Sequence, residues 1–159
     1  MAVNEKAINL KDEIKEAICD RESLKILASI SKEGIVHAVP KGSIEVDTDG
    51  NIRYLELLES SVTNRNLIYS LWFEKAVSIT VVTKEKKSWQ IKGFPVKTLV
   101  FGREFEEAYV RVQERDENMD LAAVYIIVPT EVKEQTYDVR RVEEETKHPL
   151  YIHIDRLAK

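Results

Sequence analysis

Three short segments in the middle of the sequence carry side chains that could bind an anion or a polar ring. The first comprises residues 36–43, which have the composition of a strand. Within it, Pro40 lacks a backbone donor, and Gly42 lets another molecule approach the main chain closely. A strand interrupted in this way often lines a site, so we interpret it as part of one. A simple kink in the strand is the alternative interpretation.

The second segment, residues 59–67, places small polar side chains just before and inside the start of a helix. Ser60, Ser61, Thr63 and Asn66 offer hydroxyl and amide groups there, and Arg65 adds a cation. Free N–H groups and a partial positive charge at a helix N-terminus suit a phosphate. Ordinary capping, which needs only Thr63, is the alternative; the density of polar residues favours anion binding.

The third segment, residues 88–93, combines an amide with an ammonium group. If it is a strand, Gln90 and Lys92 share one face, and Trp89 and Ile91 share the other. An amide and an ammonium on neighbouring positions could hold a polar heterocycle or a phosphate. A solvent-exposed face of a sheet is the alternative.

The sequence lacks the motifs of several common nucleotide-binding, hydrolytic and metal sites. The sequence has no Gly-x-Gly-x-x-Gly, no phosphate-loop Gly-Lys-Ser/Thr, no His-Glu-x-x-His and no Gly-x-Ser-x-Gly. A single cysteine, Cys19, excludes an internal disulfide and a cysteine-rich zinc site. The three histidines, His37, His148 and His153, are too few for a histidine metal cage. We therefore predict no metal site.

Hydrophobic periodicity predicts the elements that must position these segments. We expect helices over residues 9–20, with Asn9 as N-cap, over 63–73, with Thr63 as N-cap, and over 103–115. We expect strands over residues 24–31, 35–40 continuing through Gly42 into 43–46, 52–58, 76–83, 88–101 and 122–136. The pattern of 88–101 is broken near residues 93–95, which suggests a bulge. Residues 150–154 could form a terminal strand.

Short turns join most of these strands, whereas parallel pairing needs long crossovers. The sequence therefore predicts a mainly β fold with flanking helices, in which an antiparallel barrel has helices at its rim. We expect a single domain over residues 1–159, with its core at about 24–136 and an extension at 137–159.

The charge and hydropathy of the chain exclude some classes of binding partner. The chain has 159 residues, of which 43% are hydrophobic and 33% charged. It contains 24 basic and 28 acidic residues. A nucleic-acid binder usually shows a basic excess, so we expect no nucleic-acid partner. No apolar run approaches the length of a membrane helix and no signal peptide is evident, so we expect a cytoplasmic protein without a membrane partner.

Five segments, taken in order, resemble the flavin-binding split-barrel family, the pyridoxamine-phosphate-oxidase-like proteins. Those proteins have a His-x-Val-Pro-x-Gly type segment, a Thr/Lys-x-x-Asn-Leu helix start and a Val-Ser-Ile-Thr-Val strand. A Tyr/Trp-Gln-Ile/Leu-Lys-Gly strand and a Gly-x-x-Phe helix start follow. The matching segments here are residues 37–42, 63–67, 77–81, 89–93 and 102–105.

The resemblance implies a six-stranded antiparallel split β-barrel that forms a homodimer and binds FMN at the dimer interface. It implies that Val39, Pro40, Lys41, Gly42 and Ser43 run beside the flavin ring. Ser60, Ser61, Thr63 and Asn66 would face the phosphate and ribityl chain, and Gln90 and Lys92 would reach across to the cofactor. Many members have Lys where Thr63 stands, so Lys41, Arg65 or Lys92 would supply the phosphate counter-charge.

The first functional hypothesis is therefore an FMN-binding homodimer, a redox enzyme with an unknown small-molecule substrate or electron donor. A true pyridoxamine phosphate oxidase is disfavoured, since Arg140 and Arg141 are the only candidate pair for a second phosphate and lie among acidic residues. The alternatives are a non-enzymatic module that stores or senses flavin or heme, with His37 as axial ligand, and a structural protein with an empty barrel.

Overall fold

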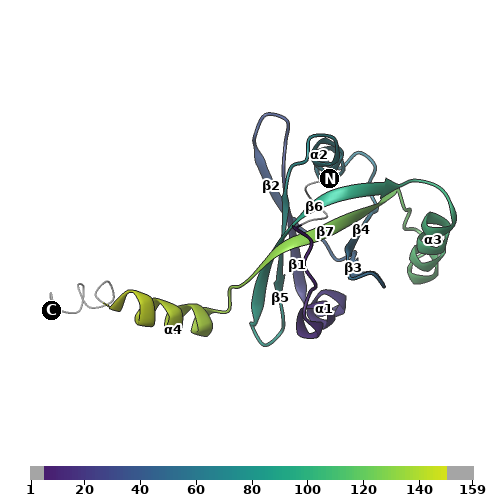
Figure 1. Ribbon diagram of the computed structural model, residues 1–159. Helices are drawn as coiled ribbons and strands as arrows, with labels where there is room; N and C mark the ends of the chain where they lie inside the picture. The colour runs from purple at the N-terminus through teal and green to yellow at the C-terminus, as the bar shows by residue number, and fades with distance from the viewer. Residues whose placement is uncertain (1–5, 150–159) are drawn as a thin grey trace.

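A computed structural model describes residues 6–149 as one curled, fully antiparallel sheet of seven strands in the order β2-β1-β5-β6-β7-β4-β3 (Figure 1). The elements are α1 (Asp12–Cys19), β1 (Leu24–Ile30), β2 (Val36–Pro40), β3 (Ile44–Val46), β4 (Ile52–Glu56), α2 (Val62–Trp72), β5 (Val77–Val82), β6 (Ser88–Leu99), α3 (Arg103–Arg115), β7 (Ala123–Glu134) and α4 (Tyr137–Lys147). The prediction of a mainly β, antiparallel fold with flanking helices is confirmed.

The segment between β2 and β3 changes the strand count. The sequence predicts one strand that continues through Gly42, and the resemblance implies six strands in all. Instead, the N–H of Lys41 makes the last bond to β1, at the carbonyl of Lys25, over 2.8 Å. Ser43 then pairs with Leu55 beside β4, because its carbonyl accepts from the Leu55 N–H over 2.9 Å. The chain thus crosses here from one edge of the sheet to the other, and the sheet has seven strands.

The predicted break near residues 93–95 is confirmed as a change of register between β6 and β7, the two longest strands. The register shifts between Lys92 and Gly93 and again between Pro95 and Lys97. A Cβ at Gly93 would lie 2.5 Å from the carbonyl oxygen of Val128, so only glycine fits this close approach. Such irregularities bend a strand and increase its twist, which helps the sheet to curl.

The core fills the concave side of the sheet. The inward-facing residues of β1, β5 and β6 alternate with outward ones, as the period of two predicts, and include Leu27, Ile79 and Ile91. Helix α1 adds Ile14 and Ile18 to this cluster. Helix α3 packs through Ala108 on a second, smaller cluster with Leu55, Leu121 and Val124.

Two helix predictions need correction, and one helix was not predicted. Helix α1 begins at Asp12 rather than at residue 9, because the N–H of Ile8 bonds to the Pro129 carbonyl over 2.9 Å and the preceding chain is extended. Helix α2 is capped by Ser61 rather than Thr63. The N-terminal part of the 137–159 extension forms α4, which points away from the sheet (Figure 1). The predicted strand at residues 150–154 lies outside the described residues.

None of the helices within residues 6–149 combines the length and apolar character that crossing a membrane requires.

Candidate functional site

A hollow of about 450 Å³ opens beside the crossing segment between β2 and β3. Four residues predicted from the sequence to contact a flavin line it, and they are consecutive. The other lining residues come from β4 and the loop after it, from the turn after α1, and from the end of α3 and the loop that follows it. The lining residues are Arg21, Pro40, Lys41, Gly42, Ser43, Tyr54, Glu56, Leu57, Leu58, Arg115 and Met119. Small-molecule sites typically enclose about 300–1,000 Å³, so this hollow has a suitable size.

The crossing segment presents main chain and a cation to this hollow. A Cβ built on Gly42 would meet no atom within 4 Å, so its backbone is open to an approaching molecule. The Lys41 ammonium lies 5.5 Å from the centroid of the Tyr54 ring, a cation–π distance. Ser43 is held in place because its hydroxyl donates to the Leu55 carbonyl over 2.7 Å. The segment is thus fixed at both ends, with Gly42 exposed between them.

The inner wall of the hollow is a buried carboxylate. Glu56 is only 1% exposed and accepts hydrogen bonds from the Tyr54 hydroxyl at 2.8 Å, the Ser61 hydroxyl at 2.7 Å and the Leu58 N–H at 3.0 Å. Burial, with the hydrogen bond to Glu56, raises the pKa of Tyr54 well above its ordinary value. All three donors are therefore committed to Glu56, and Ser61 also caps α2 by accepting from the Asn64 N–H at 2.9 Å.

Two buried tyrosines extend this network into the core. The rings of Tyr54 and Tyr125 are stacked with their centroids 6.3 Å apart. The Tyr125 hydroxyl donates to the side-chain oxygen of Asn64, and burial raises the pKa of Tyr125 to about 12. The start of α2 is thereby anchored to β4 and β7.

The other residues predicted on α2 divide between the interior and the surface. Thr63 and Asn66 are buried, and the Asn66 amide donates to the Ser29 hydroxyl over 3.1 Å. Ser60 and Arg65 are exposed. The sequence placed Ser60, Ser61, Thr63 and Asn66 together at a phosphate, but within one chain the structure brings only Ser61 to the wall of the hollow, through Glu56.

Gln90 and Lys92 share a face of the sheet, as predicted, and it is the outward face. Gln90 lies directly opposite Thr80, which lies opposite Ile26, and Ile26 in turn lies opposite Pro40. Lys92 is paired with Glu131 at 3.0 Å. The outward face therefore carries Pro40 and Gln90 in one row across four strands. Val39, on the other side of β2, lies opposite the buried Leu27 and points inward.

Two further lining residues, Arg21 and Arg115, were not predicted from the sequence. They come from the turn after α1 and from the last residue of α3, and they also line an adjoining hollow of about 200 Å³ together with Lys25. No local pattern links such distant residues, so only the fold reveals them.

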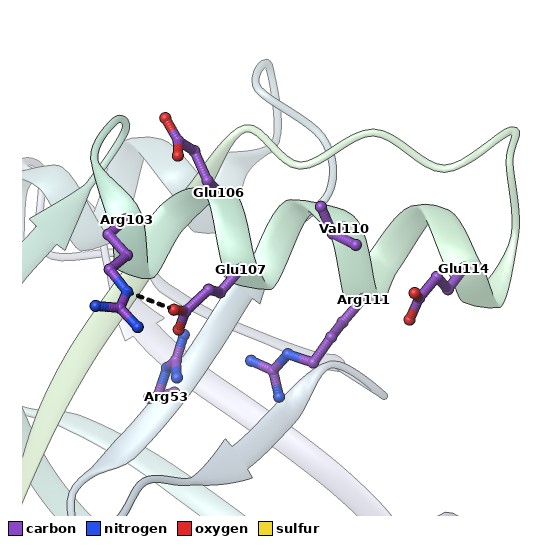
Figure 2. A pocket seen from close by; sticks show the side chains of 7 residues that line it. All are labelled: Arg53, Arg103, Glu106, Glu107, Val110, Arg111 and Glu114. Carbon is purple, nitrogen blue, oxygen red and sulfur yellow. Dashed lines mark hydrogen bonds and ion pairs between the residues drawn. The ribbon is translucent and has the colours of Figure 1, made fainter.

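A larger hollow, of about 680 Å³, lies along α3 but is balanced in charge (Figure 2). Arg103 turns to Glu107 at 2.8 Å on the same helix (Figure 2). Arg53 and Arg111 both approach the carboxylate of Glu45, at 3.6 Å and 3.1 Å. Because its arginines already have carboxylate partners, this hollow is a weaker candidate for binding an anion.

The described part of the chain contains no group of three or more His, Cys, Asp or Glu side chains that could hold a metal ion. His37 is half-buried on β2, opposite Ser29 of β1.

Comparisons with known proteins identify the fold. No protein-family model matches the sequence, and no curated protein matches it significantly. Among solved structures, HupZ of Group A Streptococcus superposes with a TM-score of 0.65 at 21% identity, covering 80% of this chain and 95% of that one. An FMN-binding protein from Syntrophomonas wolfei superposes with a TM-score of 0.62 at 12% identity, covering 84% and 88%.

A pyridoxamine 5'-phosphate oxidase-like protein from Lactobacillus delbrueckii gives a TM-score of 0.55 at 17% identity, with coverage of 79% and 93%. The chain has the split-barrel fold. At these identities the likeness concerns the fold alone, and it confirms the resemblance drawn from the sequence at that level.

Proposed function

We propose that this split barrel binds FMN in the hollow beside residues 40–43 and works as a homodimer in redox chemistry on a small molecule. The observation that carries the proposal is the hollow itself: four consecutive residues predicted to run beside a flavin ring line a cavity of suitable volume. An FMN-binding protein with the same fold supports it.

The lining suits a flat ring with a charged tail. Pro40, Leu57, Leu58 and Met119 supply apolar surface, while Lys41, Arg21 and Arg115 supply cations. The open main chain at Gly42 can offer hydrogen bonds to the polar edge of a ring. When bound, FMN supplies the electron transfer, and the protein contributes position and electrostatics. Lys41, held over Tyr54, would favour a ring that carries negative charge.

Exposed apolar side chains support the homodimer. Phe101 is 83% exposed, Trp72 is 76% exposed and Val36 is 71% exposed in the single chain. Apolar surface of this kind commonly marks protein contacts. Gln90 and Lys92 lie on the outward face of the sheet rather than in the hollow of their own chain. A second copy packed on this face would bring them to its flavin, as the resemblance implies.

A variant that fills the hollow tests its role. Gly42→Phe adds a ring where the backbone meets open space, so it blocks the cavity without straining the fold. Thr48→Phe is the control, because Thr48 is exposed in the turn between β3 and β4. We expect wild type and Thr48→Phe to retain FMN through gel filtration and Gly42→Phe to lose it. Equal retention by all three proteins would place the flavin elsewhere.

A further inference from the structure

Two arginines that have no carboxylate partner among residues 6–149 border the candidate site. Arg21 and Arg115 line both the hollow beside residues 40–43 and the adjoining smaller one. Among residues 6–149, neither guanidinium lies within ion-pair distance of an acidic side chain, whereas Arg53, Arg103 and Arg111 on the neighbouring surface all do. A guanidinium presents five donors in a planar fork that matches a carboxylate or a phosphate.

A third cation lies behind them. Lys25 is only 4% exposed and lines the smaller hollow, where its ammonium donates to the carbonyl of Asp20 over 2.8 Å. Burial lowers the pKa of Lys25, and the nearby charge of Arg115 lowers it further, against the opposing effects of Asp20 and Cys19. Arg115 and Lys25 both line the smaller hollow, so they bring two like charges to it and an anion there would be attracted by both.

The acids that reach the two hollows do not neutralise this charge. Glu45 lines the smaller hollow, but its carboxylate approaches Arg53 at 3.6 Å and Arg111 at 3.1 Å. Glu56 lines the hollow beside residues 40–43, but its oxygens accept from three uncharged donors, and it forms no ion pair with Arg21 or Arg115. The end of the site at Arg21 and Arg115 therefore keeps an excess of positive charge.

We propose that Arg21 and Arg115 bind the anionic group, a phosphate monoester or a carboxylate, of a small organic ligand whose body lies against the apolar wall of the hollow. The three residues expected from the sequence to supply a counter-charge are less well placed. Arg65 lines neither hollow, Lys92 is paired with Glu131 on the outward face, and Lys41 lies over Tyr54. The identity of the anion rests on the proposed function: it is either the phosphate of FMN or the anionic group of a substrate beside the flavin.

The test compares Arg21→Gln/Arg115→Gln with Arg103→Gln, which removes an arginine paired with Glu107 from the same helix as Arg115. FMN and riboflavin, which lacks the phosphate, are titrated into each protein. Inorganic phosphate is titrated separately, into flavin-free and FMN-loaded protein, with the thermal midpoint as readout. Because charge-assisted hydrogen bonds are strong, we expect the double variant to lose about tenfold or more in affinity for the anion, and the control to lose little.

Weaker FMN binding with unchanged riboflavin binding would identify the anion as the cofactor phosphate. Unchanged binding of both flavins, with loss of the phosphate-induced thermal shift of the FMN-loaded protein, would identify it as a substrate group. No change in any of the four titrations would overturn the proposal. If wild type binds neither flavin, the proposed function fails, and the phosphate titration of flavin-free protein alone decides this inference: a shift lost in the double variant supports it, and no shift in wild type overturns it.

Arg115 also lies in the last turn of α3, where a positive charge stabilises the helix. Should the double variant not fold, Arg21→Lys and Arg115→Lys keep the charge but lose the planar fork. Each should then weaken anion binding while circular dichroism remains that of wild type. Wild-type anion affinity in both lysine variants and an unchanged FMN affinity would contradict the proposal.

Discussion

The hydroxyl of Tyr54 donates a 2.8 Å hydrogen bond to the carboxylate of Glu56, two residues further along the same strand and on the same side of the sheet. That carboxylate also receives the Ser61 hydroxyl, which caps α2. One buried acid therefore connects the strand β4, the helix α2 and the wall of the candidate site. Its position links the stability of the barrel to the shape of the site.

Replacing Glu56 tests this connection. In Glu56→Ala, three donors lose their acceptor in a buried place, and each stranded donor costs about 1–3 kcal/mol. We expect the free energy of unfolding to fall by about 3 kcal/mol or more. Glu59→Ala, at an exposed position three residues on, should change it by less than about 0.5 kcal/mol. Urea unfolding measures both, and similar values for the two variants would contradict the role given to Glu56.

The pKa of Tyr125 predicts how stability depends on alkaline pH. Burial raises it to about 12, whereas a tyrosine in the unfolded chain ionises near about 10. Between these values the unfolded chain has released a proton that the folded chain keeps, so the free energy of unfolding falls as pH rises. The contribution of this residue is complete below about pH 10 and is lost as the pH approaches 12.

We therefore expect the loss of stability between about pH 9 and about pH 11 to be smaller in Tyr125→Phe than in wild type. Tyr137→Phe, at an exposed tyrosine in α4, should follow the wild-type profile. Urea unfolding at the two pH values gives the comparison. An equal loss of stability between the two pH values in Tyr125→Phe and wild type would show that Tyr125 ionises normally in the folded protein.

Two glycines should respond in opposite ways to alanine. A Cβ at Gly93 would lie 2.5 Å from the Val128 carbonyl oxygen, so Gly93→Ala must push β6 from β7 and should cost about 1–3 kcal/mol. A Cβ at Gly42 meets nothing within 4 Å, so Gly42→Ala should change stability by less than about 0.5 kcal/mol. Thermal or urea unfolding separates them. A neutral Gly93→Ala would mean that the bulge adjusts freely.

The proposed homodimer predicts a mass in solution. Light scattering during gel filtration should give near twice 18.4 kDa over a range of loading concentrations. The physical reason is that exposed large apolar side chains, such as Trp72 and Phe101, are costly to leave in water. A mass of one chain at all concentrations would contradict the homodimer, in which Gln90 and Lys92 reach the flavin of the second copy.

How far the sequence predicts this molecule depends on whether a feature is local. The alternation of residues 24–30 and 77–82 and the break at Gly93 follow from neighbouring side chains, and the structure confirms them. The crossing at Gly42 was missed, because the residues on both sides of it are equally suited to a strand and only the choice of partner strand separates them.

The residues of the candidate site could likewise be predicted only where the local sequence marks them. Residues 40–43 could be named in advance because their composition is unusual for a strand interior. Glu56 could not, since an acid in a strand normally faces water and its burial depends on donors from Tyr54 and Ser61. Arg21 and Arg115 line the same hollow only after α1 and α3 have packed on their separate hydrophobic clusters, so nothing in their local sequence marks them.

An equilibrium titration of FMN into the purified wild-type protein, followed by flavin fluorescence, tests the central claim most directly. The hollow beside residues 40–43 predicts saturable quenching that reaches one FMN for each chain. Fluorescence that remains that of free FMN at every protein concentration would contradict flavin binding by this barrel.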